Sequence, residues 1–134
     1  LFLSDYIHRN RARYYQILHD THGKDDYTQI ILFILEAIEH QSKITQDKII
    51  AIKELMDRTE TAIQKHGRID YHQCARILFS QPFISLTALA EDLQVTRQTA
   101  AQYVKWLESK KIVSTKKVRK TKLIYIPKFI QLLS

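Results

Sequence analysis

The sequence predicts a mainly α fold: a long helical arm, then two short helices joined by a tight turn, then a small β-hairpin. Three observations support this prediction. The 134 residues include only two glycines and two prolines, so few positions interrupt a helix. Apolar residues recur at spacings of three and four through much of the chain. After residue 111 the pattern changes to the β-branched alternation that is typical of strands.

The arm begins with a helical segment from Leu1 to about His22, whose apolar residues fall mostly on one face. Gly23 is a suitable helix stop, because glycine readily adopts the left-handed conformation found after a helix end. Asp25 or Asp26 can then cap the next helix by accepting hydrogen bonds from its free amides. We expect that helix to run from about residue 27 to residue 66, since no glycine or proline interrupts it.

The long helix carries a narrow apolar line beyond Glu39, formed by Ile49, Ile52, Met56 and Ile63. This spacing is typical of a helix that packs along one line. A helix of this length needs a surface to lie on. Upstream helices, a partner, or a second copy that forms a homodimer through the long helix would each supply one. Because Gly67 follows as a stop, we place a domain boundary there, with a helical arm at 1–67 and a second domain at 68–134.

The second domain opens with a helix from Tyr71 to about Ser80, which Asp70 can cap. A short extended segment at 83–85 follows. The next helix ends at Leu93, the turn is Gln94-Val95, and Thr96 can cap a third helix. Residues at spacings of four and three form the inward face of that third helix: Ala100, Val104 and Leu107.

The stretch from Leu89 to Thr99 fits the pattern Leu-Ala-x-x-Leu-x-Val-(Ser/Thr)-Arg-x-Thr and resembles prokaryotic helix-turn-helix units. Two alternating segments follow, at 112–118 and 122–126, with a tip at 119–121. We interpret them as the wing of a winged helix-turn-helix. Related units usually have glycine where Lys111 stands, so this lysine must accept a strained backbone or end the helix differently.

The charge distribution suggests double-stranded DNA as the partner of this domain. Residues 95–134 carry ten basic side chains and one acidic one, whereas residues 1–94 carry eleven basic and thirteen acidic ones. Such a concentrated positive charge favours a polyanion. The candidate base-contacting residues are Arg97, Gln98 and Gln102, and the candidate phosphate-contacting residues of the third helix are Thr96, Thr99 and Lys105. The candidate wing contacts are Lys116, Lys117, Arg119, Lys120 and Lys122.

Two less specific interpretations stay open for the same residues. Lysines also protect the edge of a solvated hairpin, and winged helices also serve as protein-docking folds. Catalysis has no support, since no Ser-His-Asp or Cys-His motif is present. A metal site formed by His66, His72 and Cys74 lacks a Cys-x-x-Cys pair, so we expect no metal and no cofactor. The single cysteine and the short apolar runs suit a cytoplasmic protein without a membrane segment.

The start of the chain resembles the segment that follows the catalytic core of bacterial Fic-family proteins, Leu-Tyr-Leu-Ser-x-Tyr-Ile. A helix with an aromatic pair, here Tyr14 and Tyr15, and a long helix come next in those proteins, and many of them end in a winged helix. The matching residues are Leu1, Leu3, Ser4, Tyr6 and Ile7, with Phe2 at the aromatic position.

This resemblance implies a non-catalytic C-terminal fragment of an AMP-transferring protein, with the Fic catalytic core upstream. The Fic motif His-x-Phe-x-(Asp/Glu)-Gly-Asn-Gly-Arg is absent, because neither Gly23 nor Gly67 lies in such a context. The chain also starts with leucine rather than methionine, so we expect a fragment. The alternatives are a regulatory, protein-interacting winged helix with a dimerising arm, and a stand-alone transcription regulator.

Overall fold

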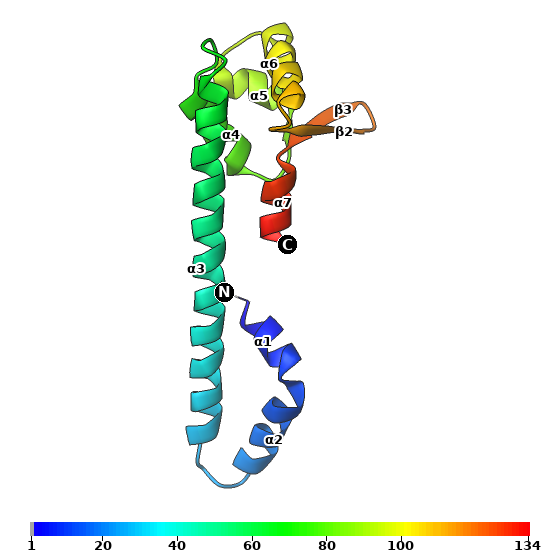
Figure 1. Ribbon diagram of the computed structural model, residues 1–134. Helices are drawn as coiled ribbons and strands as arrows, with labels where there is room; N and C mark the ends of the chain where they lie inside the picture. Colours follow the sequence, from blue (N-terminus) through cyan, green and yellow to red (C-terminus); the bar gives the residue numbers. More distant parts are fainter. Residues whose placement is uncertain (1) are drawn as a thin grey trace. The chain divides into compact units, whose positions relative to one another are not determined.

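The computed structural model describes residues 2–134, which form two compact units, 2–49 and 50–134. The first unit holds α1 (Leu3–Arg9), α2 (Arg11–Thr21) and the beginning of α3 (Thr28–Gln64). The second unit holds the end of α3 and all later elements (Figure 1). The predicted long helix is confirmed, and it begins and ends within two residues of the expected limits.

The first helical segment differs from the prediction of one continuous helix. It divides at Asn10, whose φ of −112° and ψ of 31° lie outside the helical region. The Asn10 side-chain amide donates to the Tyr6 carbonyl at 2.9 Å, as the Asn10 backbone amide does at 3.0 Å. Asparagine competes in this way with the regular helix ladder, so the break follows from a local hydrogen bond that apolar spacing cannot show.

Two contacts join α2 to α3 in the first unit. The Arg13 guanidinium donates two hydrogen bonds to the Glu36 carboxylate, at 2.7 and 3.2 Å, and lowers the pKa of that carboxyl below its ordinary value. Phe33 is fully buried beneath the rings of Tyr6 and Tyr14, each 5.6 Å away between centroids. A bidentate ion pair above an aromatic cluster therefore fixes how α2 lies on α3.

Asp26 provides the predicted cap of α3. Its carboxylate accepts the backbone amide of Thr28 at 3.0 Å, and hydrogen bonding to Thr28 lowers the pKa of Asp26. Gly23 and Gly67 both have φ of 77°, as expected for glycines that follow a helix.

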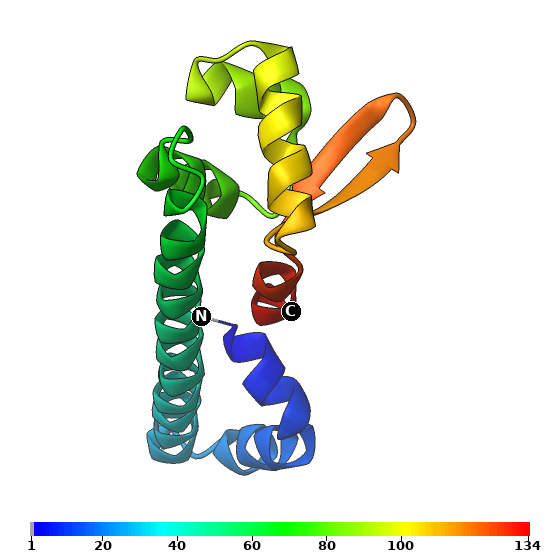
Figure 2. The ribbon, with the colours of Figure 1, turned by 45° about the horizontal axis from the view of Figure 1, so that its top comes forward.

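The second unit is a winged helix-turn-helix, so the predicted fold class is confirmed. Its helices are α4 (Tyr71–Ser80), α5 (Leu86–Leu93), α6 (Arg97–Ser109) and α7 (Pro127–Leu133). Its strands are β1 (Ile84–Ser85), β2 (Ser114–Val118) and β3 (Thr121–Tyr125), which form an antiparallel sheet in the order β1-β3-β2. In Figure 2, α5 and α6 lie next to each other, and the wing extends from beside the end of α6.

The core of this unit includes the last turns of α3. Ile63 of α3 is fully buried in one apolar cluster with Leu89 of α5, Leu107 of α6 and Ile124 of β3. The His66 ring, just beyond α3, lies edge-on to the ring of Trp106 at 4.8 Å between centroids. Residues 50–66 thus pack with the winged helix. The domain boundary that we place between residues 67 and 68 stays a prediction.

The helix α7 closes the unit after the wing. Phe129 is buried, and its ring lies 5.0 Å from that of Phe79 on α4. Leu133, by contrast, is 46% exposed. It lies in the last turn of the helix, beyond the positions that face the core.

Candidate nucleic-acid interface

The geometry of the helix-turn-helix is fixed by three local hydrogen-bonding devices. Ser85, which our sequence analysis assigned only to the strand, caps α5 by accepting the Ala88 amide at 3.1 Å. Gln94 adopts φ of 56°, and the Val95 amide donates to the Ala90 carbonyl at 3.0 Å to close the end of α5. Thr96 then caps α6 through the Thr99 amide, as predicted.

The inward and outward faces of α6 separate as the sequence predicts. Ala100, Val104 and Leu107 are fully buried, which holds this helix on the core. The candidate contact residues on the remaining surface of α6 are exposed: Arg97, Gln98, Gln102 and Lys105, with Ala101 among them. These side chains share one exposed surface of α6.

Thr96 and Thr99 lie at the beginning of α6, where the helix dipole attracts anions. Their hydroxyl oxygens are 2.9 Å apart, so one hydroxyl donates to the other. The second hydroxyl hydrogen stays available for a phosphate oxygen. Thr99 is only partly exposed, which leaves Thr96 as the more accessible of the two.

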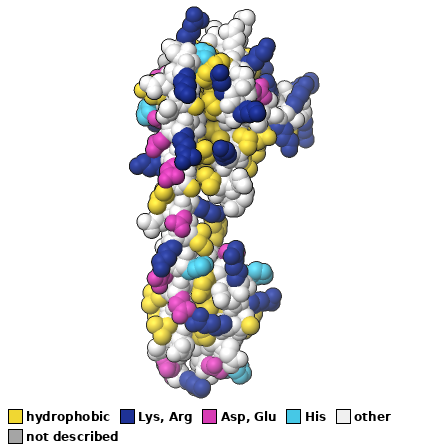
Figure 3. All heavy atoms as spheres, in the orientation of Figure 1, with side chains coloured by type: hydrophobic (Ala, Val, Ile, Leu, Met, Phe, Trp, Pro, Cys, Tyr) yellow, Lys and Arg dark blue, Asp and Glu magenta, His cyan; other side chains and the backbone are white. Residues whose placement is uncertain are grey.

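The wing presents most of the remaining positive charge. Val118 pairs with Thr121, so the connection is a two-residue turn of Arg119 and Lys120, shorter than the expected tip of 119–121. Arg119 has a φ of 55° at the first turn position, a conformation that favours glycine. Figure 3 shows Lys and Arg side chains gathered on the wing. The candidate wing residues are all exposed: Lys116, Lys117, Arg119, Lys120 and Lys122.

Glu108 is a site residue that the sequence analysis did not identify. Its carboxylate accepts the Thr115 hydroxyl hydrogen at 2.6 Å, and its other oxygen lies 3.9 Å from the Lys122 ammonium. The only acidic residue of 95–134 thus connects α6 to both strands of the wing. Its pairing also makes Lys122 less available to a phosphate than its unpaired neighbours on the wing.

Lys111 accepts the strained conformation that its position requires, with φ of 58°. The Ile112 amide donates to the Leu107 carbonyl at 3.0 Å, and the Lys111 amide donates to the Glu108 carbonyl at 2.9 Å. These two bonds form a Schellman motif, in which the left-handed residue is usually glycine. A lysine therefore ends α6 with the geometry of a glycine, at a cost in backbone strain.

The three residues of the candidate metal site, His66, His72 and Cys74, have other roles. His72 pairs with Glu60 at 3.0 Å, and His66 packs against Trp106 and Tyr103. Burial, with a smaller effect of Asp70, raises the pKa of the Cys74 thiol to about 12. Within residues 2–134 no cluster of three or more His, Cys, Asp or Glu side chains could hold a metal ion.

No helix among the described residues combines the length and the apolar character that crossing a bilayer demands.

Residues 55–129 match the family described as "Protein adenylyltransferase SoFic-like, C-terminal domain". Among solved structures, the chain is similar to one titled "Protein structure of type III plasmid segregation TubR mutant". That similarity has a TM-score of 0.43 and 16% sequence identity, and it covers 56% of this chain and 84% of the other.

Proposed function

Because this chain belongs to the family of C-terminal domains of SoFic-like protein adenylyltransferases, we propose that it is a non-catalytic module that binds double-stranded DNA. It would thereby tie an upstream AMP-transferring Fic core to a DNA site. One observation carries the proposal. The outward face of α6 is free and rich in Arg, Gln and Lys, and a wing of positive charge lies in the same unit.

The side chains on α6 have the chemistry that base recognition needs. Arginine can donate two hydrogen bonds to guanine, and glutamine can pair with the amino group and ring nitrogen of adenine. Arg97, Gln98 and Gln102 would therefore read bases in the major groove, while Thr96 and Lys105 position the helix on the backbone. The wing lysines and Arg119 would add contacts that depend on charge and not on sequence.

Binding of a fluorescent DNA duplex to the whole chain, followed by anisotropy, tests this function. Because several phosphates would be neutralised, affinity should fall by at least about tenfold between 50 and 200 mM salt. A duplex obtained by selection from random sequence should bind more tightly than a shuffled duplex of equal composition. No binding at the lowest salt concentration would contradict the proposal.

Alanine variants separate base recognition from charge. Arg97→Ala and Gln102→Ala should reduce the preference for the selected duplex by about tenfold or more, since a good bidentate contact contributes roughly 1–3 kcal/mol of discrimination. Lys120→Ala should weaken both duplexes equally. Equal losses on both duplexes for the α6 variants would rule out the groove assignment.

A non-catalytic role predicts that this chain alone transfers no AMP. Incubation with ATP that is radiolabelled on its α-phosphate, Mg²⁺ and a cell extract should label no protein beyond those labelled in the extract alone, whereas a protein that contains the Fic motif should label its target. Labelling that requires this chain would contradict the role that we propose.

A second role, homodimerisation through the long helix, is favoured by apolar side chains on α3. Ile31, Leu35 and Ile49 are each more than half exposed, which is unusual for large apolar residues along one helix. Light scattering after size exclusion should then show a dimer that Ile31→Glu and Leu35→Glu convert to a monomer. A monomer at high micromolar concentration would reject this role.

A further inference from the structure

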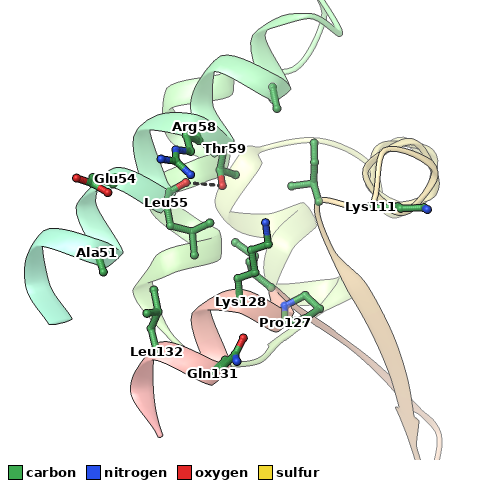
Figure 4. A pocket seen from close by; sticks show the side chains of 13 residues that line it. Ala51, Glu54, Leu55, Arg58, Thr59, Lys111, Pro127, Lys128, Gln131 and Leu132 are labelled. Carbon is green, nitrogen blue, oxygen red and sulfur yellow. Dashed lines mark hydrogen bonds between the residues drawn. The ribbon is translucent and has the colours of Figure 1, made fainter.

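The C-terminal unit contains a groove between the second half of α3 and α7, with a volume of about 570 Å³. Its apolar lining includes Leu55 and Ala62 of α3, Ile112 after α6, and Leu132 of α7. In Figure 4, Leu55 and Leu132 extend into the space between their two helices. No member of the candidate DNA-binding set lines this groove, so it is a separate feature of the unit.

A second hollow of about 360 Å³ lies next to the groove. Ala62 and Ile112 line both spaces, so the two hollows are neighbours along α3. Trp106 adds an aromatic wall, and its ring lies 6.0 Å from the Lys110 ammonium. The combined lining follows α3 from residue 51 to residue 65, which corresponds to roughly 20 Å at 1.5 Å per residue.

The border of this extended groove is strongly positive. It carries five basic side chains against a single acidic one, Glu54. Within residues 2–134, none of the five is within ion-pair distance of an acidic side chain. The basic residues are Arg58, Lys65, Lys110, Lys111 and Lys128. In Figure 4, Lys128 extends from α7 toward α3.

We propose that this groove binds an acidic amphipathic helix of a partner protein. An apolar floor takes the apolar stripe of a helix, whose anchors recur at spacings of three and four. Unpaired cations on the border suit Asp and Glu on the flanks of that stripe. A nucleic acid could pair with the cations, but it would leave Leu55, Ile112 and Leu132 facing a polar backbone. The amphipathic peptide matches both the apolar floor and the positive border.

Titration of a labelled peptide into the whole chain tests the proposal. The probe is a synthetic peptide of about 14 residues, with leucines on one helical face and glutamates beside them. One control has the same composition with the leucines scattered around the helix, and another has lysine in place of glutamate. We expect the probe to bind at least about tenfold more tightly than either control. No binding of the probe at 1 mM protein, or equal binding of the scattered control, would overturn the proposal.

Variants locate the binding surface. The double variant Arg58→Glu and Lys128→Glu should weaken the peptide at least about tenfold, because it reverses two border charges. The matched variant Arg119→Glu and Lys120→Glu, on the wing, should leave the peptide affinity unchanged. Likewise Leu132→Ala, within the groove, should weaken binding, whereas Leu133→Ala, outside it and 46% exposed, should not. Circular dichroism checks that each variant is folded.

Amide chemical shifts distinguish the remaining outcomes. The probe should move signals of residues on α3, α7 and the end of α6, and a DNA duplex should not displace it. Displacement by a duplex with shifts at Arg58 and Lys128 would identify the groove as a nucleic-acid site and overturn the proposal. Because the groove and α6 are tested by different ligands and variants, failure here leaves the test of DNA recognition intact.

Discussion

The carboxylate of Glu108 accepts the hydroxyl hydrogen of Thr115 at 2.6 Å, and this bond joins α6 to the first strand of the wing. The other Glu108 oxygen lies 3.9 Å from the Lys122 ammonium on the second strand. One acidic side chain therefore connects the helix that we expect to read bases with both strands that we expect to contact the backbone. It also reduces the positive charge of the surface on which both functions depend.

Replacing Glu108 separates its structural role from its charge. Glu108→Gln keeps an oxygen that can accept from Thr115 but releases Lys122, so DNA affinity should rise about two- to fivefold at low salt. Glu108→Ala removes both interactions and should also destabilise the unit by about 1 kcal/mol. Anisotropy and urea unfolding measure the two effects. Unchanged DNA affinity in Glu108→Gln would show that Lys122 does not contact phosphate.

The backbone at Lys111 predicts a stabilising substitution. Lys111→Gly should raise the free energy of unfolding by about 1 kcal/mol, because glycine adopts a positive φ without the strain imposed by a Cβ atom. Lys110→Gly is the matched control, since the adjacent residue has φ of −88° and gains nothing from glycine. Urea unfolding of both variants compares them with the natural chain. Destabilisation by Lys111→Gly would mean that the lysine side chain contributes more than the strain costs.

Loss of the Ser85 cap and loss of the Thr96 cap should lower the stability of the unit alike, but the two changes should affect DNA binding differently. Ser85→Ala and Thr96→Ala each remove a cap and should each cost about 1 kcal/mol. Only Thr96→Ala should also weaken DNA binding, because Thr96 lies exposed at the start of α6 and Ser85 lies before α5. Thermal unfolding and anisotropy check the two parts. An equal loss of DNA affinity in both variants would attribute the loss to stability alone.

Cys74 should be inert in the folded protein. Its ordinary pKa of 9.0 rises to about 12 on burial, so the native thiol stays protonated where the unfolded one ionises. The raised pKa of Cys74 makes its full contribution to the free energy of unfolding below pH 9. That contribution is lost as the pH rises from 9 toward 12. Iodoacetamide at pH 8 should label the native chain many times more slowly than the chain in 8 M urea. Equal rates would show that helix α4 opens readily.

Much of the fold could be predicted because the signals are local. Gly67, Asp70 and Thr96 mark helix ends through their own conformational and hydrogen-bonding preferences, and each has the expected role. The spacing of Ala100, Val104 and Leu107 correctly gave the buried face of α6. The break at Asn10 and the cap at Ser85 were missed, since both residue types occur in several contexts and only the bonded partner distinguishes them.

Other features depend on residues that are distant in the sequence. The packing of Ile63 and His66 with α6 joins the end of the long helix to the second domain, and no spacing rule connects residues forty positions apart. The groove between α3 and α7 likewise exists only because two separate helices lie side by side. Glu108 can pair with Thr115 and Lys122 only because both strands of the wing pass beside the end of α6.

The sequence by itself determined the order of the helices and strands, the family, and the basic face of the C-terminal unit, because periodicity, capping residues and charge are properties of neighbouring positions. Only the tertiary structure decided which of those charges are free. The distance to Glu108 sets Lys122 apart from Lys120. Arg58 and Lys128, in contrast, lie beside an apolar floor with no acidic partner among the described residues. Availability of a charge depends on three-dimensional neighbours, and these are fixed only when the chain packs.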